Sequence, residues 1–194
     1  MTGIIILAAG QSARLGTPKQ NLIYKGNTLL QHTINAALQS VCKPIIVVLG
    51  AYAADILPTI DAKDIEIIRN DDWEEGMASS IRASITALQK HPDIDSALIM
   101  LCDQPHVDAL LLKTMIHRLQ DSHKGIIACA YNGTLGVPVL FNKQYFAGLL
   151  LLTGHDGAKK ILAAHLSDIA AVPFPLGAVD IDTMADYTNL SNLP

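Results

Sequence analysis

Short runs of apolar residues, mostly β-branched or leucine, recur along the first three quarters of the chain. They span residues 4–8, 45–49, 65–68, 97–102, 126–130 and 137–141, and most of them end at a glycine or a polar residue. Nearly continuous apolar runs are typical of strands that are buried on both faces of a sheet. Each run is therefore predicted to form a strand.

Between these runs, hydrophobic residues recur every three or four positions, as they do on one face of a helix. Thr28, with Gln31 three residues later, matches a capping box and predicts a helix start. The apolar face of this helix is predicted to contain Leu30, Ile34, Ala37, Leu38 and Val41. Further helices are predicted near residues 53–57, 77–88, 111–119, 143–152 and 158–164, with a last one after Thr183.

This alternation predicts a single α/β domain over residues 1–194, with a mostly parallel sheet between two layers of helices. The runs at 126–130 and 137–141 are joined by the turn residues Asn132 and Gly133, which predicts a small antiparallel part. The expected fold is therefore a three-layer α/β domain. Ligands of such sheets bind at the carboxyl ends of the strands, so candidate chemistry is sought there.

Composition narrows the possible partners. A net charge of −4 argues against a nucleic acid, which would need a basic face. No apolar run approaches the roughly 18 residues of a membrane span, and no basic segment precedes the first one as in a signal peptide. The three cysteines are widely spaced, fit neither a disulfide framework nor a zinc site, and suit a reducing compartment. A cytoplasmic protein without a membrane partner is expected.

The stretch "LAAGQSARLGTPKQ", residues 7–20, follows the first predicted strand. Its glycines match neither the G-x-G-x-x-G fingerprint nor the Walker loop. Small residues still allow backbone N–H groups to approach an anion, and Arg14 and Lys19 offer two complementary ways to bind phosphate. A phosphate-binding loop and an ordinary polar connection with two solvated cations remain equally compatible with the composition.

Carboxylates follow two other predicted elements. Asp103 in "LIMLCDQP" ends a buried strand, where it could hold Mg²⁺ together with substrate phosphates, or make an ordinary turn or helix cap. Asp180 and Asp182 in "VDIDT" alternate, so they could point the same way on an extended segment. Asp182 or Thr183 could equally cap the last helix.

A third stretch, "NDDWEEGMASSIRAS", places polar residues at a helix start. The free N–H groups there, with Gly76 and the hydroxyls of Ser79 and Ser80, could bind an anion or a polar base edge. A helix start with ordinary polar decoration explains the same residues. Nucleophile-elbow, H-E-x-x-H and C-x-x-C motifs are absent from the sequence.

In this order, the stretches resemble the nucleotidyltransferase family of the molybdenum cofactor cytidylyltransferases and the related guanylyltransferases. "LAAGQSARLGTPKQ" resembles L-A-A-G-x-S-x-R-M-G-x-x-K-Q of the cytidylyl branch, with Leu15 in place of methionine. "GNTLLQHTINAA", "NDDWEEGMASSIRASI", "LCDQP", "GVPVLF" and "DIDT" also have counterparts. The resemblance covers nearly the whole chain.

The resemblance implies a single Rossmann-like domain. It also implies an enzyme that binds CTP and Mg²⁺, transfers CMP to the phosphate of molybdopterin and releases pyrophosphate. Arg14, Lys19 and Asp103 are implied to be catalytic. Asp103 with Asp180 or Asp182 is implied to bind the metal. Nucleotide contacts are implied for Leu7, Ala8, Ala9, Gly10, Ser12, Arg14, Lys19, Asn70, Gly76, Ser79 and Ser80. Ala9, where the guanylyl branch usually has glycine, favours cytosine over guanine.

The chain departs from the family pattern G-D-x-G-A-R, which here reads "GHDGAK", with His155 for Asp and Lys159 for Arg. The acceptor is therefore less constrained than the nucleotide. The alternatives are GTP or another NTP, another phosphorylated acceptor such as a sugar phosphate, and a nucleotide-binding accessory protein without turnover. Transient contact with a molybdoenzyme that receives the product is a further expectation.

Overall fold

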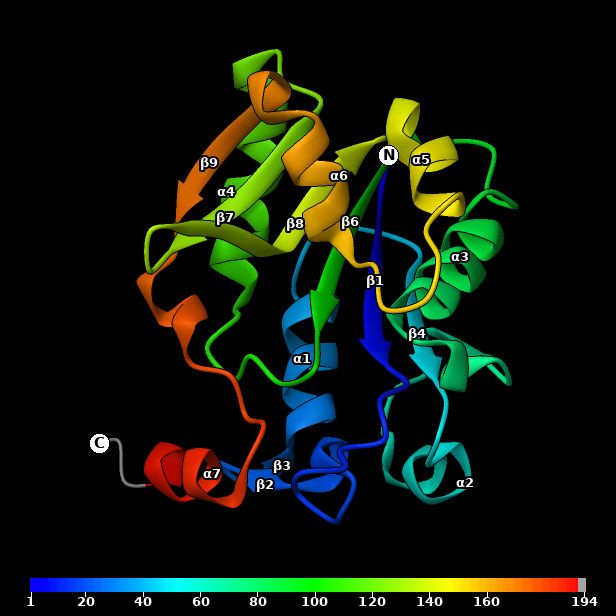
Figure 1. Cartoon of the computed structure of the whole chain (residues 1–194), viewed down its shortest axis with the longest axis vertical. Helices are drawn as coiled ribbons and strands as arrows, with labels where there is room; N and C mark the ends of the chain where they lie inside the picture. Colours follow the sequence, from blue (N-terminus) through cyan, green and yellow to red (C-terminus); the bar gives the residue numbers. More distant parts are fainter. Residues whose placement is uncertain (192–194) are drawn as a thin grey trace.

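A seven-stranded sheet forms the centre of the domain (Figure 1). The structure is a computed structural model and describes residues 1–191, so the last three residues of the predicted domain lie outside the described part. β8 runs antiparallel to both of its neighbours, and the other pairings are parallel. The strand order is β5 (Glu66–Arg69), β4 (Ile45–Leu49), β1 (Thr2–Ala8), β6 (Ser96–Leu101), β8 (Thr134–Asn142), β7 (Ile126–Tyr131) and β9 (Ile169–Pro173).

Helices cover both faces of this sheet, so the predicted three-layer α/β fold is confirmed. One hydrophobic core contains residues of α1 (Leu29–Leu38), α2 (Ala53–Ile56) and α4 (Ala109–Ser122). The other contains residues of α3 (Met77–Leu88), α5 (Phe146–Leu150) and α6 (Ala158–Ala164). No helix within residues 1–191 is both long enough and apolar enough to cross a membrane.

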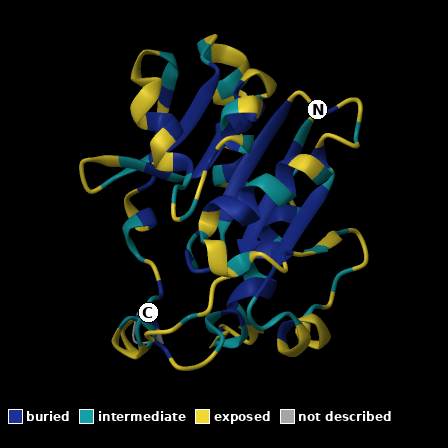
Figure 2. Ribbon diagram, turned by 45° about the vertical axis from the view of Figure 1, so that its right-hand side comes forward, coloured by how far each residue is buried: buried dark blue, intermediate teal, exposed yellow. Residues whose placement is uncertain are grey.

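The continuous apolar runs follow from this arrangement. In β1, Ile4 and Ile6 belong to one core, and Ile5 and Leu7 belong to the other. Figure 2 shows the central strands as the most buried part of the molecule. Burying each such side chain contributes about 1.5–3 kcal/mol, so a polar residue at any of these positions would oppose folding.

Three features differ from the predicted elements. β9 was not predicted, because its inward residues alternate with exposed ones and include a small alanine. A two-stranded hairpin of β2 (Ile23–Tyr24) and β3 (Asn27–Thr28) was also missed, because each strand has only two residues. Val41 was wrongly placed on the face of α1, which ends at Leu38. Val41 is 74% exposed.

The topology creates a crevice beside β1. The chain passes from β1 to β4 on one side and later returns to β6 on the other side. In the register of β1 and β6, Leu7 lies opposite Leu101, so both strands end at the same level. The direction in which strands are added to the sheet thus reverses at β1. Such a reversal leaves the carboxyl ends of two neighbouring strands accessible to a ligand.

The C-terminal segment crosses this same edge of the sheet (Figure 1). After β9 and a short 3₁₀ turn at Pro175–Ala178, the chain reaches α7 (Met184–Ser191), which packs on the β2–β3 hairpin through a small cluster that includes Tyr24 and Leu190. The backbone N–H of Ile181 donates to the carbonyl of Asp103 at 3.0 Å. The segment is thereby tied to the end of β6.

Candidate active site

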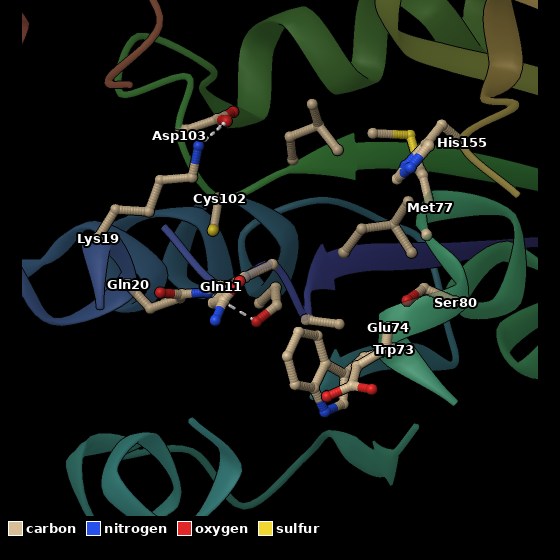
Figure 3. A pocket seen from close by; sticks show the side chains of 16 residues that line it. Gln11, Lys19, Gln20, Trp73, Glu74, Met77, Ser80, Cys102, Asp103 and His155 are labelled. Atoms are coloured by element: carbon tan, nitrogen blue, oxygen red, sulfur yellow. Dashed lines mark hydrogen bonds and ion pairs between the residues drawn. The ribbon is translucent and has the colours of Figure 1, made fainter. Parts of the chain in front are cut away.

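A cleft of about 520 Å³ opens at the carboxyl ends of β1 and β6 (Figure 3). Its lining comes from the loop after β1, the start of α3, the end of β6 and the loop before α6. The predicted site residues that line it are Leu7, Ala8, Ala9, Gly10, Lys19, Gly76, Ser80 and Asp103. The cleft therefore brings together residues from three of the predicted stretches: the loop after β1, the start of α3 and the end of β6.

The loop after β1 folds back on itself and so directs Lys19 into the cleft. Ser12 adopts a positive φ of 53°, and its hydroxyl oxygen accepts from the backbone N–H of Lys19 at 3.1 Å. The buried amide of Gln20 donates to the carbonyls of Ala8 at 2.8 Å and Gly10 at 3.2 Å. These bonds fix the loop, so it is not merely a solvated connection.

Four charged side chains form a cluster on one side of the site, which we call the charged wall: Arg14, Lys19, Asp103 and Asp182. Lys19 and Asp103 line the cleft, and Arg14 and Asp182 lie behind them. Lys19 Nζ lies 2.6 Å from Asp103 Oδ2 and 2.9 Å from Asp182 Oδ1. Arg14 Nη2 donates to the other oxygen of Asp182 at 2.9 Å. The side chains of Lys19 and Asp103 are 14% and 12% exposed, whereas that of Arg14 is 72% exposed.

This arrangement changes the protonation behaviour of the acidic and basic groups. Burial alone would lower the pKa of Lys19, but the charge of Asp103 and the hydrogen bonds to both carboxylates outweigh it, so that pKa lies above its ordinary value. The hydrogen bond from Lys19, helped by the charges of Lys19 and Arg14, holds the pKa of Asp182 below its ordinary value. Lys19 and Asp182 are therefore both charged at neutral pH.

Asp103 offers a free ligand atom for a metal. Its Oδ1 is buried and has no hydrogen-bond partner among the described residues. An unpaired buried carboxylate oxygen is costly, and a hard divalent cation is the partner that such an oxygen prefers. Within residues 1–191, no three His, Cys, Asp or Glu side chains form a metal-binding group. A cation here would need one carboxylate and ligand oxygens from phosphates, which is the usual pattern for Mg²⁺.

The predicted acidic pair does not act as one unit. Asp182 faces Lys19 and Arg14, whereas Asp180 is exposed and lines a neighbouring cleft. Although the residue is exposed, the surrounding cleft partly desolvates the Asp180 carboxylate and so raises its pKa. The negative charges of Asp103 and Asp182 raise this pKa further. The cap of α7 is provided by Thr183, whose hydroxyl accepts from the N–H of Asp186, so Asp182 is left to pair with the cations.

The second wall, which we call the uncharged wall, consists of Asn70, Gly76, Ser79 and Ser80. Asn70 Nδ2 donates to the hydroxyls of Ser79 at 2.8 Å and Ser80 at 2.9 Å. Ser79 in turn donates to the carbonyl of Gly76 at 2.8 Å. Ser80 lines the cleft, whereas Asn70 and Ser79 are buried and support it.

The start of α3 is less free than its sequence indicates. The backbone N–H of Ala78 donates to the carbonyl of Gly154 at 3.1 Å, so one of the N–H groups expected to bind a ligand already has a partner. Gly76 has a φ of 118°, and a Cβ at this position would lie 2.5 Å from that same carbonyl oxygen. Glycine is therefore required for this close approach.

A second cleft of about 480 Å³ adjoins the first. Both clefts share Met77, Leu101, Asp103 and His155. Lys159, Tyr131 and Asp180 line the second cleft and not the first. The two clefts therefore meet at Asp103.

Several lining residues were not predicted from the sequence. The first cleft also contains Gln11, Gln20, Trp73 and Cys102. Trp73 lies in the predicted motif "NDDWEEG", where a tryptophan among charged residues could have been noticed. Burial raises the pKa of the Cys102 thiol to about 12, so this side chain is neutral. Conversely, Ser12 and Arg14 do not line the cleft, and they contact Lys19 and Asp182 instead.

The fold and the site together define an α/β protein with a cleft at the carboxyl ends of its central strands, where the strand order reverses. Residues 4–169 match the family model described as the MobA-like NTP transferase domain, and the chain belongs to this family of nucleotidyltransferases.

Two curated relatives have different names. The chain is 35% identical over 147 residues to the nicotine blue oxidoreductase of Paenarthrobacter nicotinovorans, covering 75% of this chain and 68% of that protein. It is 32% identical over 142 residues to the molybdenum cofactor cytidylyltransferase of Escherichia coli K12, covering 72% and 69%. The family is therefore shown, whereas the reaction differs among its relatives.

Solved structures agree on the fold. A homologue of Mycobacterium tuberculosis Rv0371c from Mycobacterium sp. strain JC1 superposes with a TM-score of 0.87 at 29% identity, covering 98% of this chain and 94% of that one. The M. tuberculosis H37Rv protein itself, in complex with manganese, gives 0.81 at 27% identity, covering 100% and 98%. A solved structure with this fold therefore contains a divalent metal.

Proposed function

We propose that this chain is a Mg²⁺-dependent cytidylyltransferase that transfers CMP from CTP to the terminal phosphate of molybdopterin and releases pyrophosphate. The observation that carries the proposal is the charged wall. Asp103, with a free oxygen, lies where the two clefts meet, and it is ion-paired to Lys19 of the first cleft. Arg14 adds a second cation beside them through Asp182. The first cleft would take CTP and the second the acceptor.

The proposed transfer of CMP needs no acid–base catalyst for the attacking group. An oxygen of the acceptor phosphate forms a bond to the α-phosphorus of CTP, and the bond from that phosphorus to the bridging oxygen breaks. The electron pair leaves with pyrophosphate. The attacking phosphate is already anionic, so no general base is required, and the barrier lies in bringing two anions together.

The residues of the charged wall address that barrier. Lys19 and Arg14 would bind the phosphates of CTP, and the backbone N–H groups after β1 would add neutral donors. Asp103 would hold the metal, which when bound neutralises phosphate charge. Ser80 and Gly76, on the uncharged wall, would frame the base together with Ala9.

The choice of CTP is supported by Ala9, which is 6% exposed and lines the first cleft. A methyl group here narrows the end of the cleft more than a glycine would. The acceptor is supported by the similarity to the E. coli cytidylyltransferase and by Lys159 in the second cleft, a cation that suits a phosphorylated acceptor. GTP or a sugar phosphate would use the same chemistry with different contacts.

A redox function is the competing candidate, because one relative is named an oxidoreductase. The loop after β1 lacks the G-x-G-x-x-G spacing that dinucleotide cofactors require. Oxidation of NADH or NADPH by this protein with a dye as acceptor would favour that candidate.

Pyrophosphate release tests the proposal. The purified protein would be given each of the four NTPs with Mg²⁺, with and without molybdopterin. Release with CTP that depends on molybdopterin is expected. A preference for GTP would overturn the role given to Ala9, and release with CTP that requires another phosphorylated acceptor would overturn the role given to molybdopterin.

A further inference from the structure

In the free protein, the groups of the charged wall are bound to one another. The ammonium of Lys19 lies between Asp103 Oδ2 and Asp182 Oδ1, at 2.6 and 2.9 Å, and Asp182 Oδ2 accepts from Arg14 at 2.9 Å. Two cations and two carboxylates thus form a set without net charge. Lys19 and Arg14, which are proposed to bind phosphate, are therefore paired with the two carboxylates. One of these carboxylates, Asp103, is the proposed metal ligand.

This pairing opposes the entry of either ligand alone. A triphosphate must attract Lys19 and Arg14 away from Asp182, which leaves bare carboxylates beside a polyanion. A divalent cation must compete with the ammonium of Lys19, which is already 2.6 Å from Asp103. When both ligands arrive, the triphosphate takes the cations and the divalent cation takes the carboxylates. No charged group is then left without a partner of opposite charge.

Resting on the proposed function, we propose that Asp182 is a positioning residue that holds Lys19 and Arg14 until the metal and the nucleotide arrive together. Asp182 exchanges these partners on binding, so metal and nucleotide bind with positive coupling. By linkage, the metal raises the affinity for the nucleotide by the same factor as the nucleotide raises the affinity for the metal.

Asp182, more than Asp103, is placed to make this exchange. Its side chain is 32% exposed, against 12% for Asp103, so water can replace a lost partner. It also lies on the segment between β9 and α7, next to Ile181, which anchors that segment to the carbonyl of Asp103. Asp103 stays in place at the end of β6, and the ion pairs of Asp182 can break around it.

The test measures binding of CTP by calorimetry to the full chain, in EDTA and in Mg²⁺. In EDTA, Asp182→Asn is expected to bind CTP on the order of fivefold more tightly than the unmodified protein, the factor that corresponds to one partly exposed ion pair. The gain of affinity conferred by Mg²⁺ should shrink by a similar factor.

Asp180→Asn is the matched control. It removes one negative charge from the same segment, but Asp180 makes no ion pair with either cation among the described residues. A general effect of charge would strengthen CTP binding equally in both variants. A gain in Asp182→Asn that is clearly larger than in Asp180→Asn supports the exchange, whereas equal gains overturn it.

Lys19→Met tests the effect of the ion pairs on metal binding, independently of Asp182→Asn. It frees Asp103 Oδ2 and Asp182 Oδ1, so Mn²⁺ alone, followed by its electron paramagnetic resonance signal, should bind more tightly than to the unmodified protein. Lys25→Met, which removes a cation from the β2–β3 turn, should show no such gain. Unchanged or weaker Mn²⁺ binding in Lys19→Met contradicts the proposal.

The outcomes separate this inference from the proposed function. If CTP binds with Mg²⁺ and Asp182→Asn gives no gain in EDTA, the exchange is wrong and the function stands. If CTP binds to neither protein under any condition, the proposed function fails and the exchange fails with it.

Discussion

The charged wall and the uncharged wall of the cleft differ in how their polar groups are satisfied. On the charged wall, Lys19 is shared between Asp103 and Asp182, and Asp103 Oδ1 has no partner in the described structure. On the uncharged wall, Asn70 donates to both serines and its Oδ1 accepts from the N–H of Asp72. The charged wall keeps a carboxylate oxygen that is free to bind a ligand. The polar groups of the uncharged wall are already hydrogen-bonded to one another and to the backbone.

This difference assigns different tasks to the two walls. The ion pairs of Asp182 are partly exposed and cost little to exchange, so Lys19 and Arg14 can leave Asp182 to bind phosphates. A buried network of neutral hydrogen bonds is costly to break and therefore holds its shape. Substitutions on the charged wall should affect activity first, and substitutions on the uncharged wall should affect stability first.

The largest effect on activity is expected for Asp103→Asn. The amide keeps the shape of the side chain but loses the anionic ligand, so turnover should fall by on the order of 10²–10³, the usual cost of losing one charge-stabilising group. Pyrophosphate release measures the change. Circular dichroism should show an unchanged fold.

Asp108→Asn serves as the control for that variant. Asp108 caps α4 by accepting from the N–H of Leu111, and asparagine caps helices equally well. Its activity should match that of the unmodified protein. An active Asp103→Asn variant would remove Asp103 from the proposed metal site.

On the uncharged wall, Gly76→Ala should cause the largest loss of stability. The new Cβ would meet the carbonyl oxygen of Gly154 at 2.5 Å in a backbone conformation with a φ of 118°. Strain and overpacking together should lower the free energy of unfolding by about 3 kcal/mol or more. Urea unfolding measures the loss.

Gly133→Ala separates the two causes. Gly133 also has a positive φ, of 70°, but a Cβ there would meet nothing within 4 Å. This variant should lose only the part that is due to backbone strain, about 1 kcal/mol. Equal losses in both variants would mean that the contact with Gly154 does not constrain the start of α3.

Asn70→Ala should give an intermediate loss. It removes the donor for two buried hydroxyls, which should cost about 1–3 kcal/mol of unfolding free energy. Thermal unfolding measures the change, and Asn189→Ala, at an exposed position of α7, is the control. A stable Asn70→Ala variant would show that the uncharged wall is not held by this network.

The smallest effect is a dependence of stability on pH. Because its partners hold the pKa of Asp182 below the ordinary 3.8, its contribution is present above that value and is lost as the pH falls through the folded-state pKa. The stability difference between the unmodified protein and Asp182→Asn should be constant down to about pH 5 and should shrink from there toward about pH 2. Urea unfolding across this range measures it.

Asp180 should show the opposite sign. Its pKa is raised, so its ionised form destabilises the folded protein above that pKa and its neutral form does not. Asp180→Asn should therefore stabilise the protein at neutral pH and have little effect near pH 3. The same trend in both variants would contradict the different environments of the two carboxylates.

The sequence predicted the central strands and the candidate loops for clear physical reasons. A strand such as β1 is buried on both faces and must be apolar throughout, so Ile4 to Ala8 could be recognised without a structure. Asp103 follows directly after a buried strand, so its place at the ligand edge could also be predicted. β9 and the β2–β3 hairpin are too short or too irregular to carry such a signal.

The partners within the site could not be predicted. Asp182 is 163 residues from Lys19 in the sequence, and no local pattern indicates that α7 packs on the β2–β3 hairpin to bring them together. The alternation of Asp180 and Asp182 predicted a shared direction, whereas the two carboxylates line different parts of the site. Contacts over this separation are set by the tertiary fold.

A crystal structure with Mg²⁺ and a non-hydrolysable CTP analogue would test the central claim most directly. We predict that the phosphates lie against the charged wall, with Lys19 and Arg14 on phosphate oxygens and released from Asp182. The metal is expected on Asp103 Oδ1, and the base between Ala9 and Ser80. Phosphates bound elsewhere, or bound in the cleft while Lys19 stays between Asp103 and Asp182, would contradict it.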